Sequence, residues 1–272
     1  MTMNEGILAS TTFFHRDGAS YLPTTGTRGP WDPNSLHGRV VAGLLMHEVE
    51  RRHLDPAFQV SRVTVDMFRV APMRPVTVVT SVVRDGNRIR VADASLRLED
   101  GLEVARASVV MLRRAPAPPG QVWAPPEWDA PHPDDLPAPP PPPSQFGPPM
   151  WETRAITGRL GFSEGEPPVQ KRVWVRDTID FVEDEPPSPL VRAAMMSDFA
   201  NPFANAGTHG LNYVNADASL YLHRNPVGEW IGLEVAAHHA SEGIAIGECV
   251  LYDLDGAFGR STVCGVANQR RP

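Results

Sequence analysis

Hydrophobic and polar residues alternate along the chain in two similar stretches, each containing one apolar helical segment. In the first stretch, Val41 and Leu45 recur at helical spacing, and period-two alternation follows. Asp85-Gly86 marks a hairpin turn within it, because glycine accepts the positive φ of a tight turn. The predicted helix covers residues 38–52, and the predicted strands cover residues 60–70, 76–83, 89–98 and 104–113.

The second stretch repeats this order after a strand at residues 172–177. Ser188 followed by Pro189 is typical of a helix start, since serine caps the free N–H groups and proline suits the first turn. The predicted helix covers residues 189–199, and the predicted strands cover residues 211–223, 230–239, 244–252 and 258–266.

The two stretches align without a gap at an offset of 155 positions. Residues 67–69 fall on residues 222–224, and Asp100-Gly101 falls on residues 255–256. A repeat of this length indicates two copies of one small domain.

The second helical segment is apolar on most faces, so it must be covered on nearly all sides. The sequence therefore predicts an α+β double hotdog, with two antiparallel sheets each wrapped around a central helix. The inner edges of the two sheets can join, which leaves neither exposed. The predicted domains are an N-terminal hotdog at residues 1–115, a Pro-rich connector at residues 116–149, and a C-terminal hotdog at residues 150–272.

The connector holds about half of the 29 prolines, including the run at residues 139–143. Proline fixes φ and lacks an N–H donor, so we expect an extended spacer that crosses the surface. A ligand for a proline-reading domain is the alternative.

Charge and composition exclude several functional classes. A net charge of −7 argues against a nucleic-acid partner, because such binding rests on basic surfaces. Residues 1–10 lack the features of a signal peptide, and no apolar run reaches the length of a membrane span, so we predict a cytoplasmic protein without a membrane partner. Cys249 and Cys264 give neither a disulfide framework nor a four-ligand metal site.

Several motifs in both halves resemble the acyl-CoA thioesterase II family and the wider thioesterase-like proteins built as double hotdogs. The first half carries Gly-Pro-Trp-Asp at residues 29–32 and Leu-His-Gly-Arg-Val-Val-Ala-Gly at residues 36–43. The second half carries Met-Ser-Asp-Phe at residues 196–199, Asn-Ala-Asp at residues 215–217, and matching residues at 222–224, 228–230, 255–256 and 259–262. The likeness covers nearly the whole chain apart from the connector.

The resemblance implies hydrolysis of a fatty acyl-CoA thioester by a water activated on an aspartate, without metal or organic cofactor. It also implies a homo-oligomer, either a dimer or a tetramer. The family's aspartate falls on Asp198, its threonine on Asn215 and its glutamine on Cys264. Asparagine can still donate a hydrogen bond, whereas cysteine is only a weak donor.

Comparison of the two copies predicts one site per chain. Asp198 falls on Gly43, so only the second half carries the carboxylate. His37 and Gly38 precede the first helix, where free N–H groups can polarise a thioester carbonyl. We also expect Arg224 to contact a CoA phosphate, although an arginine that ends a strand is commonly structural.

Two other functions remain open at this point. Asp32, Asn34 and His37 match the D-x-N-x-x-H spacing of hotdog enoyl-CoA hydratases, in which an aspartate and a histidine activate water. A non-catalytic acyl-CoA-binding double hotdog protein is the second alternative, supported by the missing glutamine. In either case Asp198 would be free to cap a following turn.

Overall fold

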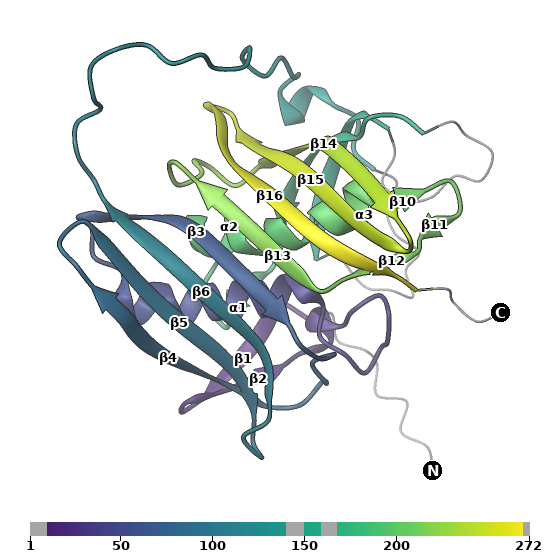
Figure 1. Ribbon diagram of the computed structural model, residues 1–272. Coiled ribbons are helices and arrows are strands. Elements are labelled where there is room, and N and C mark those ends of the chain that lie inside the picture. The colour runs from purple at the N-terminus through teal and green to yellow at the C-terminus, as the bar shows by residue number, and fades with distance from the viewer. Residues whose placement is uncertain (1–9, 140–149, 159–167, 269–272) are drawn as a thin grey trace.

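The computed structural model describes residues 10–139, 150–158 and 168–268, and most of these residues surround one curved sheet (Figure 1). The sheet is mostly antiparallel and has 14 strands within the described residues. Helix α1 (Gly38–His53) packs against helix α2 (Pro189–Asp198), and the short helix α3 (Ala200–Ala204) follows α2 directly. Both long helices lie on the same face of the sheet (Figure 1).

The main strands form two meanders in the order that the sequence predicts. In the first half the strands are β3 (Phe58–Met67), β4 (Val76–Asp85), β5 (Ile89–Leu98) and β6 (Glu103–Arg113). In the second half they are β13 (Asp217–Leu222), β14 (Ile231–Ser241), β15 (Ile244–Asp253) and β16 (Gly256–Ala267), and β12 (Tyr213–Asn215) also pairs with β16. The spatial order is β4-β5-β6-β3 in one half and β14-β15-β16-β13 in the other.

The two meanders join where β3 pairs antiparallel with β13. Ser219 lies opposite Thr64, 155 positions away, and its hydroxyl donates to Thr64 Oγ1 at 3.3 Å. Residues that are counterparts in a repeat can face each other across an antiparallel pair only at a local two-fold axis. The two meanders, which the sequence relates by an offset of 155 positions, are therefore related in the fold by a local two-fold axis at the β3–β13 pair.

The two predicted sheets join at their inner edges, because the β3–β13 pairing makes a single continuous sheet. Pairing satisfies the backbone groups that both inner edges would otherwise expose.

Shorter strands extend the sheet at both ends. Beyond β14 lie β8 (Arg172–Asp177) and β7 (Trp151–Thr157); beyond β4 lie β2 (Ser20–Pro23), β1 (Thr12–Asp17) and the parallel β9 (Asp180–Val182). A separate hairpin pairs β10 (Ala206–Gly207) with β11 (Gly210–Leu211), and 3-10 turns cover Thr25–Thr27 and Pro133–Asp135. The β1–β2 hairpin has no counterpart among the elements that the sequence pattern indicates.

Local chemistry sets both ends of α2. Ser188 Oγ accepts the Val191 N–H at 3.1 Å, as its position before Pro189 predicts. At the other end, Pro202 lacks the N–H that would continue the helical ladder to the carbonyl of Asp198. The helix therefore ends at Asp198, and the Asp198 carboxylate lies at the C-terminal end of α2.

A buried ion pair connects the two halves beneath this end of α2. The Arg39 guanidinium pairs with Asp177, and both side chains are almost fully buried. Aromatic rings of Phe13, Trp151 and Phe199 surround the guanidinium, with its carbon 4.8–5.6 Å from their centroids. Arg39 thus fixes the start of α1 against β8 and the end of α2.

Part of the connector packs on the second half, where the sequence predicted only a spacer. The Trp128 ring stacks on Tyr252 with centroids 4.1 Å apart, and its Nε1 donates to Glu234 at 2.8 Å. Gly232 lies directly under the Trp128 ring, and any Cβ there would overlap it. Residues 140–143 of the proline run, like residues 1–9 at the N-terminus, lie outside the described residues.

Candidate active site

A cavity of about 800 Å³ lies where the start of α1 meets the end of α2. Its wall is mainly apolar and aromatic, and includes Leu36, Met67, Trp151, Phe199 and Phe203. Both halves contribute to it, so the cavity depends on the packing of the two copies. Its volume suits a ligand of the size of a small organic molecule or an acyl chain.

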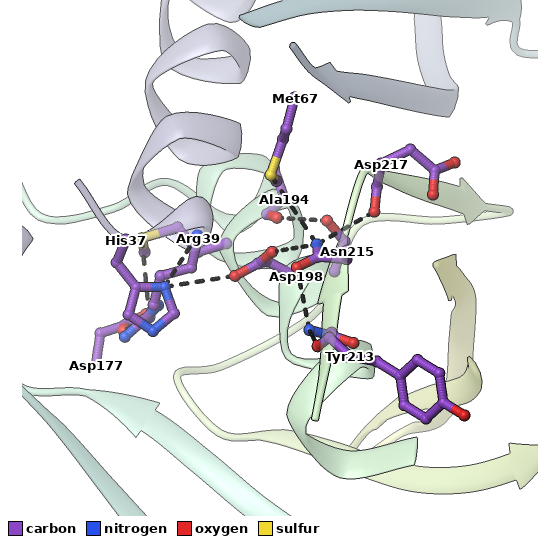
Figure 2. Close-up of polar contacts among 12 residues, drawn as sticks. His37, Arg39, Met67, Asp177, Ala194, Asp198, Tyr213, Asn215 and Asp217 are labelled. Atoms are coloured by element: carbon purple, nitrogen blue, oxygen red, sulfur yellow. Dashed lines mark hydrogen bonds and ion pairs between the residues drawn. The ribbon is translucent and has the colours of Figure 1, made fainter. Parts of the chain in front are cut away.

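Asp198 is the carboxylate in this cavity, and only 5% of its surface is exposed. Asn215 Nδ2 donates to Asp198 Oδ1 at 2.9 Å, and His37 Nδ1 lies 3.4 Å from Asp198 Oδ2 (Figure 2). The structure therefore brings together the three polar side chains that the sequence placed on different elements.

Gly38 allows the carboxylate to approach the start of α1. A Cβ at this position would lie 2.7 Å from Asp198 Oδ1, closer than real atoms approach. The first-turn N–H groups of α1 carry partial positive charge, which favours an anion there. No acceptor in the described part of the chain contacts the Gly38 N–H, so this donor is available to a ligand.

His37 Nδ1 faces two groups and can serve only one at a time. It accepts the Arg39 N–H at 3.2 Å, as a helix cap, and it lies beside Asp198 Oδ2. A lone pair on Nδ1 caps α1, whereas a proton on Nδ1 donates to Asp198. The rings of Trp151 and Phe199 hold the imidazole edge-on, with centroids 6.1–6.2 Å away. His37 is thus a rigid partner whose tautomer is coupled to the carboxylate.

Asn215 lies where β12 ends, just before β13 begins. Its Nδ2 also donates to the carbonyl of Asp217 at 3.2 Å, and its Oδ1 accepts from Asn201 Nδ2 at 3.1 Å. Both amide hydrogens are therefore committed, one of them to Asp198. Asn215 orients the carboxylate and leaves a cavity-facing side of Asp198 for water or ligand.

Cys264 does not line the cavity. Its side chain lies on the exposed face of β16, whereas Val263 and Gly265 beside it are buried. Partial burial, with the Asp217 carboxylate as the next cause, raises the pKa of the Cys264 thiol to about 11. The structure therefore does not place Cys264, the position that the resemblance gives to the family's glutamine, in the cavity.

Arg224 does not reach the cavity either. Its guanidinium binds the buried Asp253 carboxylate with two nitrogens and also donates to the carbonyls of Gly256 and Ala257. It braces the turn before β16, so the structure gives this residue a structural role and does not bring it to the cavity.

Three basic residues that were not selected from the sequence do line the cavity: Arg28, Arg69 and Lys171. Arg69 is the repeat counterpart of Arg224, and of this pair the structure places Arg69 in the cavity lining. Lys171 precedes β8, donates to the carbonyl of Ala206 at 3.2 Å, and has its pKa lowered by burial. Period-two alternation with Val173 and Val175 was the available signal for its inward direction.

The hydratase motif does not form a site. Asp32 is exposed, its Oδ1 accepts the Asn34 N–H at 2.8 Å, and Asp32 is not among the residues that line the cavity. Within the described residues, no cluster of three or more His, Cys, Asp or Glu side chains could hold a metal. Those residues also contain no helix long and apolar enough to span a membrane.

Comparison with known families identifies both halves. Residues 27–112 match the acyl-CoA thioesterase N-terminal domain, and residues 128–262 match the acyl-CoA thioesterase C-terminal domain. The chain belongs to the acyl-CoA thioesterase family. The C-terminal match begins at Trp128, where the connector starts to pack on the second half of this thioesterase. Comparison with curated proteins by sequence finds no match.

Solved structures share this fold at low identity. A tesB protein from Mycobacterium avium subspecies paratuberculosis is 16% identical with a TM-score of 0.68, covering 94% of this chain and 96% of its own. Acyl-CoA thioesterase II TesB2 from Mycobacterium marinum is 18% identical with a TM-score of 0.64, covering 95% and 96%. A protein of unknown function with a hot dog fold from Alicyclobacillus acidocaldarius is 17% identical with a TM-score of 0.70, covering 96% and 97%. These likenesses establish a hotdog fold.

Proposed function

We propose that this double hotdog thioesterase hydrolyses fatty acyl-CoA with a water activated by Asp198. The observation that carries the proposal is the buried Asp198 carboxylate, fixed by Asn215 and His37 at the start of α1. Each carboxylate oxygen keeps a lone pair for water, which is what a general base requires.

In the reaction, Asp198 accepts a proton as the water oxygen attacks the thioester carbonyl carbon. The charge that develops on the carbonyl oxygen is stabilised by the first-turn N–H groups of α1, including that of Gly38. Collapse of the tetrahedral intermediate breaks the carbon–sulfur bond, and the CoA thiolate takes up the proton held by Asp198. His37 holds the carboxylate in place throughout this transfer.

The cavity lining suggests which residues contact the CoA phosphates and which contact the acyl chain of the substrate. Arg28 and Arg69 are exposed and line the cavity, so their guanidinium groups are suited to the phosphates of CoA. The aromatic and aliphatic wall suits the acyl chain. Arg69 takes the role first expected of Arg224.

Non-catalytic binding of acyl-CoA is the second candidate, because the family's glutamine has no counterpart in the cavity at Cys264. The hydratase alternative loses its support with the exposed position of Asp32.

A homo-oligomer in the cytoplasm remains part of the proposal. Ile244, Ile246 and Val266 are each 49% or more exposed on neighbouring strands β15 and β16, an apolar face that a second copy could cover. Light scattering coupled to size exclusion would give the mass in solution, and a monomer would contradict this part of the proposal.

The test is release of free CoA, followed with a thiol reagent, from acetyl-, hexanoyl-, decanoyl- and palmitoyl-CoA. We expect hydrolysis by the wild type and a loss of about 1,000-fold or more in Asp198→Ala, the range of a general base. Crotonyl-CoA absorbance is followed in parallel. Binding without release of CoA would instead favour the non-catalytic function, and loss of enoyl absorbance that depends on Asp32 would favour the hydratase.

A further inference from the structure

Beside Asn215, a row of polar side chains leads from the cavity, which Asn201 also lines, to the surface of the second half. We call it the amide series: Asn215, Asn201, Asn205 and His238. Asn201 and Asn205 are 2% and 4% exposed, so water does not satisfy their amides. Buried polar groups cost stability unless they are hydrogen-bonded, and these four bond one another.

The series is continuous from the surface to the carboxylate. His238 Nδ1 lies 2.8 Å from Asn205 Oδ1, and Asn205 Nδ2 donates to Asn201 Oδ1 at 3.0 Å. Asn201 Nδ2 then donates to Asn215 Oδ1 at 3.1 Å, and Asn215 Nδ2 donates to Asp198 Oδ1 at 2.9 Å. In each bond between two asparagines of the series, and in the last bond to Asp198, the donor is the residue farther along the series from Asp198.

Two backbone carbonyls fix this direction. Asn201 Nδ2 also donates to the carbonyl of Tyr213 at 3.1 Å, and Asn215 Nδ2 also donates to the carbonyl of Asp217 at 3.2 Å. A carbonyl only accepts, so turning either amide over would place oxygen against oxygen. With Asn201 fixed in this way, Asn205 must turn its Nδ2 toward Asn201 and its Oδ1 toward His238. Asn205 Oδ1 needs a donor there, so His238 carries a proton on Nδ1, as it does in both the Nδ1–H tautomer and the imidazolium.

The surrounding sheet leaves room for the series. A Cβ at Gly247 on β15 would lie 2.7 Å from Asn205 Oδ1, and a Cβ at Gly265 on β16 would lie 3.7 Å from Asn205 Nδ2. The first half shows the contrast, since the repeat counterparts of Asn201 and His238 are Met46 and Val83. At these two positions the first copy therefore has apolar side chains in place of the members of the row.

We propose that Asn201, Asn205 and His238 are positioning residues that act through Asn215 to hold the Asp198 carboxylate in its reactive orientation. This inference rests on the proposed function, because it assigns these residues to hydrolysis at Asp198. They occupy the supporting role left open by the absence of a cavity-facing glutamine on β16. Because each donor in a hydrogen-bonded row polarises the next, the loss of a distant member weakens the bond to Asp198.

Three variants interrupt the series at different distances from Asp198. Asn201→Asp keeps the shape but replaces the donor toward Asn215 by an acceptor, and we expect kcat to fall about 100-fold. Gly247→Ala displaces Asn205 without removing any member, with an expected loss of about 10-fold, and His238→Ala should cost about 3-fold. In all three, KM should stay within twofold of the wild-type value.

Each variant has a matched control outside the series. Asn212→Ala removes an exposed amide that bonds the carbonyl of His209, Gly207→Ala adds a Cβ where nothing lies within 4 Å, and His239→Ala removes the neighbouring imidazole. All three controls should keep the wild-type kcat. His238→Gln restores a donor and should recover part of the lost rate, which a merely structural role would not predict.

Kinetics are measured on the best hydrolysed acyl-CoA of the panel, with folding checked by circular dichroism. If Asn201→Asp fails to fold, the remote Gly247→Ala and His238→Ala variants still decide. Wild-type kcat in those variants, or a raised KM at unchanged kcat, overturns the inference while leaving the Asp198→Ala result intact. A wild-type protein that hydrolyses no acyl-CoA overturns the proposed function and this inference together.

Discussion

The two halves of the chain share one backbone plan and differ where the site lies. Asp198 and Asn215 occupy the positions of Gly43 and Val60 in the first copy. A Cβ at Gly43 would lie 2.7 Å from Met195 Cγ and 2.8 Å from Phe181 Cε2, so packed side chains fill the equivalent space. Gly43 and Asp198 are thus equivalent positions in the repeat, but of these two only Asp198 borders the cavity.

The residues at the start of α1 also differ from their repeat counterparts. Gly38 leaves the start of α1 open to the carboxylate, whereas its counterpart Ala193 lies inside α2, which begins at Pro189. Beside it, Arg192, the counterpart of His37, donates to the carbonyls of Gly228 and Pro187 at 2.9 and 3.2 Å. His37 and Gly38 therefore line the cavity, whereas their counterparts are buried inside α2. Exchanging residues between the copies tests this division.

Copying the carboxylate into the first half should produce the largest change. Gly43→Asp forces a buried, unpaired carboxylate against Met195 and Phe181, and we expect the free energy of unfolding to fall by about 4 kcal/mol. Urea denaturation measures this, and Gly43→Ala separates the added Cβ from the charge. Unchanged stability with a second catalytic centre would break the comparison.

Replacing Asn215 by valine, the residue at the equivalent position 60, should remove the hydrogen bond that holds the Asp198 carboxylate. Asn215→Val keeps a similar volume but leaves the carboxylate without its 2.9 Å donor, so kcat should fall about 100-fold. Steady-state kinetics and melting temperature are measured together. A fall in stability without a fall in kcat would assign Asn215 to the core only.

Copying Ala193 onto the start of α1 should displace the carboxylate. The new Cβ in Gly38→Ala would lie 2.7 Å from Asp198 Oδ1, and we expect kcat to fall about 10-fold as the carboxylate moves from its position. The fold should survive, because alanine favours a helix. Equal kcat for wild type and variant would show that this close approach has no catalytic role.

The arginine pair should separate substrate binding from structure. Arg69→Ala should raise KM about fivefold, through the loss of one phosphate contact, with kcat unchanged. Arg224→Ala should lower the melting temperature, because the buried Asp253 loses its partner, and leave KM as it is. The reverse pattern would return the binding role to Arg224.

The smallest effect concerns Lys171, whose counterpart Arg16 is exposed. Burial lowers the pKa of Lys171, so the unfolded chain binds more protons and stability rises as pH approaches the ordinary lysine pKa. Lys171→Met should therefore stabilise the protein at neutral pH, and the gain should shrink toward about pH 10. A gain independent of pH, measured by urea denaturation, would exclude this cause.

Much of the fold was predictable because the same order of elements can be recognised in both copies of the repeat. Ile89–Leu98 and the start of α2 at Pro189 agree with the sequence pattern to the residue. The β1–β2 hairpin was missed, since its short strands lack the longer alternation that periodicity detects. The union of the two sheets was allowed but not fixed by the sequence, because edge pairing depends on tertiary contacts.

The site was only partly predictable. Asp198, Asn215 and His37 follow from motifs and converge as expected. Cys264 does not join them, because its side chain is exposed on β16 and the sequence pattern does not fix which part of that strand reaches the cavity. The amide series escaped notice because Asn201 lies in α3, a helix too short for a periodic signal, and Asn205 follows that helix directly.

Titration of the Asp198→Asn protein with decanoyl-CoA in a calorimeter tests the central claim, that the two copies build a single catalytic site. We predict one molecule bound per chain, with the thioester intact after the titration. Two molecules bound per chain, or release of free CoA at the wild-type rate, would contradict the account.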